Sequence, residues 1–309
     1  MEVVSYSREL LDSFVELYNR EGAFSSFISH LDERTFERHV AAKAFFDPES
    51  VFLATAGGRV AGAVFTTFCP REDGEDFHPS RGAVAGLFFP RSRPAVGDAL
   101  LARALSHLEI RGSASVEGSS PRTGYPFWRD LYCGSEPVLR AEQRHVAEAF
   151  SRAGFSPASR AAGLLAEIPS GLEASSAAGA ASRCSIYNRP AENPTFWDKN
   201  SWLGLWPMVL EAKVEGFLAG RLGWCELPAT SRRRGVRTAG IYHLRVEPQF
   251  RRRGVATALV ARLFEEAARD GASEVLVACE RGNRAALRVY RKSGFHEVFG
   301  MVGMHLVSL

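Results

Sequence analysis

The stretch "RRRGVATALVARLFEEAARDGA" (residues 251–272) sets three arginines against a glycine and then continues in a helical pattern. Its apolar residues recur every four positions from Val255 to Ala267, and charged residues fall between them. This spacing predicts an amphipathic helix that ends near Gly271. The arginines either form a basic patch for nucleic acid or border a loop that binds one small polyanion.

A strand is predicted directly before this loop, in "IYHLRVEP" (241–248). Alternation along it predicts two faces, one with Tyr242, Leu244 and Val246 and a wetter one with His243, Arg245 and Glu247. A strand that turns through a glycine into a helix directs backbone N–H groups and the positive end of the helix dipole at one point. Gly254 lets ligand oxygens approach the backbone, and the arginines add charge-assisted contacts. The order therefore predicts a site for a small phosphorylated ligand.

Two further elements follow the helix. The run "EVLVACE" (274–280) is short and almost entirely apolar, which is typical of a strand that is covered on both faces. The next run, "GNRAALRVYRKSGF" (282–295), predicts a helix that Asn283 caps and Gly294 ends. The predicted order is strand, glycine loop, helix, strand, helix.

These elements resemble the GNAT superfamily of acetyl-CoA-dependent N-acyltransferases. The family's loop motif, Gln/Arg-x-x-Gly-x-Gly/Ala, is here Arg251-x-x-Gly254-x-Ala256. The segment "LRVEP" (244–248) is similar to the family's fourth strand, and Asn283-x-x-Ala286-x-x-x-Tyr290-x-x-x-Gly294-Phe295 fits its last helix. The resemblance is strong from about 239 to 296, weak over 184–238 and secondary over 1–168.

The resemblance implies transfer of an acetyl group from acetyl-CoA to a primary amine, and the cysteine and histidine spacing predicts no metal. In the family the glycine loop holds the CoA pyrophosphate, the strand pairs with the pantetheine arm, and the last helix contributes an asparagine contact to that arm. The cofactor-binding residues that this implies are Leu244, Arg245, Val246, Arg251, Arg252, Arg253, Gly254, Val255, Ala256, Asn283 and Ala286. Asn283 as a simple helix cap is the structural alternative.

Amide formation needs a base and an acid, because an ammonium has no free electron pair and a departing thiolate gains from a proton. In the family the tyrosine that corresponds to Tyr290 lies near the CoA sulfur, so Tyr290 is the predicted acid. Glu247 is the predicted base and His243 the second choice, since both lie on the wetter face of the strand. Tyr290 as a core aromatic remains the alternative.

The pattern also occurs earlier in the chain, in an N-terminal copy. The run "AVGDALLARAL" (95–105) parallels "GVATALVARLF" (254–264), and "FSRAGF" (150–155) parallels "YRKSGF" (290–295). Small, flexible residues dominate 169–183, "PSGLEASSAAGAASR", which predicts a linker. The predicted fold is α/β (α+β), with two tandem GNAT-like domains, 1–168 and 184–309, each a mixed central β-sheet flanked by helices.

The N-terminal copy lacks residues of the family motif that phosphate binding and proton donation need. Ala95 replaces the central glycine, Pro94 lacks an N–H, and Phe150 stands where a tyrosine would donate a proton. We therefore predict a supporting first domain that binds no CoA. An aromatic insert at 119–144 and the tryptophan-rich run at 193–207 either line a substrate pocket or pack inside the fold.

Composition limits the alternatives. The 309 residues carry a formal net charge of +3, which is low for a protein that follows a nucleic-acid backbone. Five cysteines stand singly, without the spacing of a zinc site, and no stretch resembles a signal peptide or a membrane span. We expect a cytoplasmic enzyme with a small-molecule or peptide amine as acceptor, and no membrane or nucleic-acid partner. A non-catalytic acyl-CoA sensor and a basic nucleic-acid module stay open as alternatives.

Overall fold

The computed structural model describes residues 1–169, 184–192 and 195–309, so all but the first residue of the predicted linker lies outside the described residues. The chain forms two compact units. Unit 1 consists of Met1–Arg160, Asn193–Gly204 and Gly300–Leu309, and unit 2 of Ala161–Glu192 and Leu205–Phe299.

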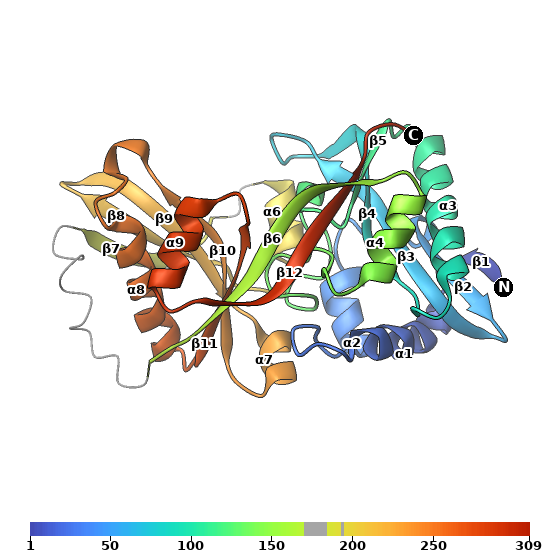
Figure 1. Ribbon diagram of the computed structural model, residues 1–309, viewed down its shortest axis with the longest axis horizontal. Coiled ribbons are helices and arrows are strands. Elements are labelled where there is room, and N and C mark those ends of the chain that lie inside the picture. Colours follow the sequence, from blue (N-terminus) through green and yellow to red (C-terminus); the bar gives the residue numbers. More distant parts are fainter. Residues whose placement is uncertain (170–183, 193–194) are drawn as a thin grey trace. The chain divides into compact units, whose positions relative to one another are not determined.

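The sheet of unit 1 is mixed (Figure 1). In spatial order its strands are β1 (Glu2–Ser5), β2 (Val51–Ala56), β3 (Arg59–Pro70), β4 (Phe77–Phe88), β5 (Ser115–Gly118) and the end of β12 (His296–Leu306). Neighbours from β1 to β4 run antiparallel, β4 and β5 run parallel, and β12 pairs antiparallel with β5. The last strand of this sheet therefore comes from the far end of the chain.

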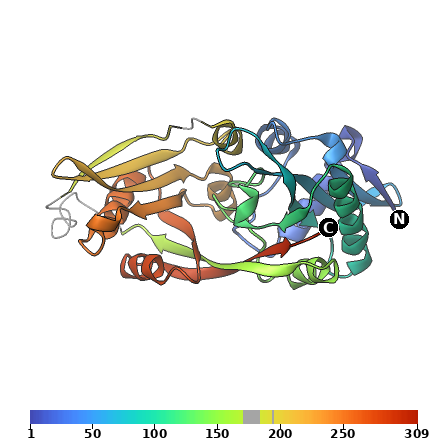
Figure 2. The same ribbon diagram turned by 90° about the horizontal axis from the view of Figure 1, so that it is seen from above.

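Helices cover both faces of the unit 1 sheet (Figure 2). They are α1 (Leu11–Gly22), α2 (Glu33–Phe36), α3 (Pro94–Ile110), α4 (Arg144–Arg152) and α6 (Phe196–Ser201), with short 3-10 helices at Arg8–Leu10, Pro48–Ser50 and Pro121–Thr123 and a π-helix at Glu37–Ala41. Val64 packs in one cluster with residues of α3 and α4, whereas the ring of the next residue, Phe65, contacts Phe14 of α1. Successive side chains of a strand point to opposite faces, so α1 and α3 cover different sides.

Unit 2 repeats this arrangement. In spatial order its strands are β7 (Ser185–Pro190), β8 (Met208–Val214), β9 (Phe217–Glu226), β10 (Thr238–Val246), β11 (Glu274–Glu280) and β6 (Ser156–Glu167). β7 to β10 are antiparallel neighbours, β10 and β11 are parallel, and β6 pairs antiparallel with β11 from Ala161 to Glu167. The predicted architecture, two repeats that each contain a mixed central sheet flanked by helices, is confirmed.

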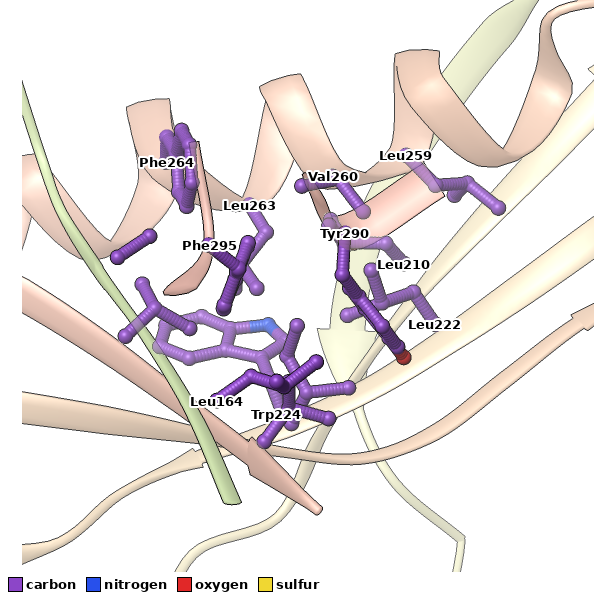
Figure 3. Packing of buried hydrophobic residues seen from close by; sticks show 14 of the residues in the cluster. Leu164, Leu210, Leu222, Trp224, Leu259, Val260, Leu263, Phe264, Tyr290 and Phe295 are labelled. Atoms are coloured by element: carbon purple, nitrogen blue, oxygen red, sulfur yellow. The ribbon is translucent and has the colours of Figure 1, made fainter. Parts of the chain in front are cut away.

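The helices of unit 2 are α7 (Pro228–Arg234), α8 (Val255–Arg269) and α9 (Arg284–Lys292), with a short turn at Pro248–Phe250. The predicted apolar stripe of α8 is buried and packs on the sheet together with Trp224 and residues of α9 (Figure 3). Each fully buried leucine of this cluster contributes about 2 kcal/mol of hydrophobic stabilisation. The core thereby fixes α8 and α9 over the strands that carry the site.

Candidate functional site

The two parallel strands of unit 2 separate halfway along their length. β10 and β11 pair from Thr238↔Glu274 to Ile241↔Val277. Beyond that point β11 continues beside β6, and β10 continues beside β9 to Val246. Within the described part of the chain, the edge of β10 after Ile241 has no partner strand on the β11 side, so its backbone groups there are open to a ligand.

A β-bulge accompanies this separation, and it corrects one sequence expectation. The pairing of β10 with β9 shifts between Ile241 and His243, so Tyr242 is the extra residue. Leu222 and Trp224 point into the core, so Gly223 between them faces the other side of the sheet. A Cβ built on Gly223 would lie 2.5 Å from the Tyr242 ring, so the ring lies on that side. Leu244 packs against the core. Alternation placed Tyr242 with Leu244, but the bulge places it on the opposite face.

The loop between β10 and α8 holds two residues in the left-handed region. Arg252 has φ 61° and Gly254 has φ 84°. Within the described residues, the backbone N–H groups from Arg252 to Thr257 make no hydrogen bond, as is normal for the start of a helix. Such groups, with the helix dipole behind them, favour an anion.

A cleft of about 750 Å³ opens between the end of β10, this loop and α9. Its volume falls in the range of small-molecule and cofactor sites. The residues that line it are Leu244, Arg245, Val246, Phe250, Arg251, Arg252, Gly254, Val255, Ala256, Thr257, Asn283, Ala285, Ala286, Arg288, Val289 and Lys292. Five of these side chains are cationic and none is acidic, so the cleft suits a polyanion that also has an apolar part.

Ten of the eleven predicted cofactor-binding residues line this cleft, the exception being Arg253. The Arg253 guanidinium lies 5.7 Å from the centre of the Phe250 ring instead. Arg251 donates from Nε to the Val246 carbonyl at 3.2 Å, which ties the loop to the end of β10. The structure thus gathers residues from three separate segments around one space.

Helix α9 forms a wall of the cleft that the sequence predicted only in part. Asn283 caps the helix, since its side chain accepts the Ala286 N–H at 3.1 Å, and it also lines the cleft. Arg288 and Lys292 line the same wall and were not predicted. Their signal was present in the sequence, because they follow Ala285 at helical spacing and share its face.

Tyr290 lies in the core beside the cleft wall and is 4% exposed. Its ring packs 5.3 Å from that of Phe295, in the cluster that Figure 3 shows from close by. Tyr290 is not among the described residues that line the cleft, although Ala286 and Val289 on the same helix are. The ring therefore packs in the core next to residues that line the cleft.

His243 lies in β10, and Glu247 directly follows that strand. The half-buried Glu247 carboxylate lies 3.6 Å from the Arg245 Nε. His243 is exposed and lies opposite Gly223 on the face that Tyr242 covers. Desolvation of the imidazole by neighbouring groups, and then the charges of Arg245 and Arg221, lower the pKa of His243 below its ordinary value. Like Tyr290, neither residue is among the described residues that line the cleft.

The matching position in unit 1 is filled by the chain itself. β4 and β5 pair from Arg81↔Ser115 to Val84↔Gly118, and the insert follows. Leu139 donates its N–H to the Ser119 carbonyl at 3.3 Å and accepts the Val302 N–H at 2.8 Å. The cavity that remains, about 20 Å³, has room for about one water molecule.

The aromatic residues of this insert pack inside unit 1. Phe127 and Trp128 are 1% and 2% exposed, and the Trp128 indole stacks on Tyr18. Two tryptophans of the 193–207 run also pack there, since Trp197 donates to the Gly124 carbonyl at 2.9 Å and Trp202 lies under the Arg129 guanidinium. Trp206, in unit 2, is 88% exposed. Packing is thus the observed role of both segments except for Trp206.

The described ranges hold no metal-binding cluster and no membrane-spanning helix. In 1–169, 184–192 and 195–309 no group of histidine, cysteine and acidic residues could hold a metal ion. No helix in those ranges is long and apolar enough to cross a membrane.

The chain is similar to known acetyltransferases. Residues 180–295 match the model of the acetyltransferase (GNAT) family. No curated protein matches the sequence.

Three solved structures have a similar fold. A tandem GNAT protein from the clavulanic acid biosynthesis pathway is 13% identical, with TM-score 0.67 over 98% of this chain and 97% of that one. A GCN5-related N-acetyltransferase from Sphaerobacter thermophilus is 15% identical, with TM-score 0.64 over 100% and 96%.

A fungal glucosamine N-acetyltransferase region of a multi-domain β-N-acetylglucosaminidase is 15% identical, with TM-score 0.70. It matches 99% of this chain, which spans only 38% of that protein. At these identities the likeness shows the fold. Together with the repeated architecture, it confirms the predicted fold class, two tandem GNAT-like domains, and residues 180–295 are the part of the chain that is similar to the family model.

Proposed function

We propose that unit 2 transfers an acetyl group from acetyl-CoA to a primary amine. The observation that carries this proposal is the cleft of about 750 Å³, with unbonded loop N–H groups at one end and no acidic side chain in its lining. CoA combines a pyrophosphate with a long, uncharged pantetheine arm. The loop from Arg251 to Ala256 suits the pyrophosphate, because backbone N–H groups and guanidiniums both bind phosphate oxygens.

The pantetheine arm fits the open edge of β10. Its amide groups can pair with the backbone beyond Ile241, as an added strand would. Leu244 and Val246 line the cleft along this edge and offer apolar contact. The arm would then run from the loop toward the point where β10 and β11 separate, and the thioester would lie near the bulge at Tyr242.

The chemical step needs proton transfers at that point. Loss of a proton frees the electron pair of the amine, attack on the thioester carbonyl gives a tetrahedral intermediate, and the thiolate leaves as it gains a proton. We propose Tyr290 as the donor and Glu247 as the base, with His243 as the second choice. The lowered pKa of His243 favours its neutral form, which can accept a proton near pH 7.

A non-catalytic acyl-CoA sensor is the second candidate. One observation favours it, since none of the three proposed catalytic side chains is among the described residues that line the cleft. A sensor and an enzyme would bind acetyl-CoA equally well. They differ in whether the addition of an amine releases free CoA.

The deciding experiment mixes the full chain with acetyl-CoA and a panel of amines, including amino sugars, polyamines, amino acids and peptides, and follows free thiol. Release of CoA that depends on one amine class supports the transferase. Tight binding of acetyl-CoA by calorimetry, without release across the panel, supports the sensor. Absence of binding to either CoA or acetyl-CoA overturns both proposals.

A further inference from the structure

Four arginines form a stripe along α9 and the turn before it. Arg284, Arg288 and Arg291 follow one another at spacings of four and three residues, which places them on one face of the helix, and Arg281 lies in the turn before it. Together with Leu287 they line a second hollow, of about 510 Å³. No acidic residue lines this hollow.

The charges of this stripe are largely uncompensated by the protein. Arg281 forms an ion pair with Glu297. Arg284, Arg288 and Arg291 form no ion pair with any residue that the structure describes, and all three are exposed. Like charges at these spacings repel one another along a helix. A bound anion would relieve this repulsion and gain several charge-assisted hydrogen bonds.

Arg288 connects the stripe to the cleft, because it lines both spaces. CoA carries two separate phosphate groups, namely the pyrophosphate and a phosphomonoester on the 3′ oxygen of its ribose. The loop before α8 is the part of the cleft that the proposed function assigns to the pyrophosphate. The phosphomonoester needs partners of its own, and planar guanidiniums match its oxygens two at a time.

We propose that the arginine hollow of α9 binds the 3′-phosphate of CoA. The proposal rests on the proposed function, since it assigns the far end of the same ligand. It means that Arg284 and Arg291 select CoA over the same molecule without its 3′-phosphate. The expected effect of these two arginines is on the affinity for CoA.

The test compares CoA with 3′-dephospho-CoA by calorimetry on the full chain. The unaltered protein should bind CoA at least about tenfold more tightly, the scale of one or two charge-assisted contacts. In the double variant Arg284→Gln/Arg291→Gln the affinity for CoA should fall to that for 3′-dephospho-CoA. Affinity for 3′-dephospho-CoA should stay within about twofold, which also reports that the variant is folded.

A matched control is Arg232→Gln/Arg233→Gln, which removes two exposed positive charges on α7 of the same unit. This control should keep the preference for CoA over 3′-dephospho-CoA. Loss of the preference in the control would mean that it arises from long-range charge, and would overturn the subsite. Equal binding of the two ligands by the unaltered protein, or a preference that survives in the α9 variant, also overturns the subsite alone. Binding of inorganic phosphate at the arginine hollow in the presence of saturating CoA would also overturn the subsite, because the 3′-phosphate would then not occupy the hollow. If neither CoA form binds, the proposed function falls, and this proposal falls with it.

Discussion

The Oδ1 atom of Asn283 accepts the backbone N–H of Ala286 at 3.1 Å, so a side chain that lines the cleft is also the cap of α9. An amide has both an acceptor and donors. The cap uses the acceptor, and the Nδ2 donors are the part of Asn283 that a ligand can use. Capping and ligand binding can therefore be separated by substitution.

Asn283→Asp should keep the cap and weaken CoA binding. The carboxylate still accepts the Ala286 N–H, so the free energy of unfolding in urea should change by less than about 0.5 kcal/mol. CoA affinity should fall about tenfold, because a donor is replaced by a negative charge. Asn283→Ala should lose about 1 kcal/mol of stability with the cap. Wild-type affinity in the Asp variant would leave Asn283 with a structural role only.

Gly254→Ala should lower CoA affinity beyond its effect on stability. Its φ of 84° is strained for alanine by about 1 kcal/mol, and the new methyl group enters the space where phosphate oxygens approach. Gly235→Ala is the matched control, with φ 75° and no atom within 4 Å of the added Cβ. Thermal unfolding should shift similarly in both, whereas calorimetry should find a roughly tenfold or larger loss only at position 254. Equal CoA affinities in the Gly254→Ala and Gly235→Ala variants would refute the phosphate site.

Tyr290→Phe should reduce turnover about 100-fold while acetyl-CoA affinity changes little, because the ring stays and the proton donor is lost. Tyr18→Phe is the control for a buried hydroxyl, since Tyr18 donates to the Leu131 carbonyl at 2.8 Å in unit 1. That variant should lose about 1 kcal/mol of stability and no activity. Parental turnover in Tyr290→Phe would mean that another group protonates the thiolate.

One chain should bind one CoA. The space in unit 1 that corresponds to the cleft has only about 20 Å³ left, because the insert pairs with Ser119 and Val302 there. Calorimetry on the full chain should give a single site, and Arg251→Glu/Arg252→Glu should abolish it by placing carboxylates at the phosphate position. A second site of similar affinity that survives in this variant would contradict the assignment.

If His243 is the base, the midpoint of the acid limb of the pH–rate profile should equal the pKa of His243. Desolvation, and then the charges of Arg245 and Arg221, lower the pKa of His243 below its ordinary value, so Arg221→Gln should raise that pKa and move the limb to higher pH. Histidine NMR titration measures the same pKa directly. A limb that stays in place while the NMR midpoint moves would assign the base elsewhere, with Glu247→Gln as the next variant.

The pattern of neighbouring residues in the sequence predicted the parts of the site that depend on local backbone geometry. The loop at Gly254, the helix from Val255 and the cap at Asn283 each follow from the chemistry of a few neighbouring residues. Ten of the eleven residues that were predicted to bind the cofactor therefore line one cleft. Arg288 and Lys292 could have been included by extending the helical spacing one turn further.

Features that depend on distant pairing could not be predicted in this way. Strict alternation assigned Tyr242 to the core face, and the bulge that reverses it is set by the register with β9. The filling of the unit 1 cleft likewise depends on contacts of Leu139 with Ser119 and Val302, residues far apart in the sequence. No local pattern encodes such contacts.

The pairing of Met304 with Gly118 also sets an order of events during biosynthesis. At about 5–20 residues per second, a ribosome needs roughly 10 to 40 s to travel from one residue to the other. Through that interval β5 has an open edge, which is a site for wrong pairing between nascent chains. The first repeat to be made is thus the one whose sheet is completed late, and its maturation is timed by synthesis of the second.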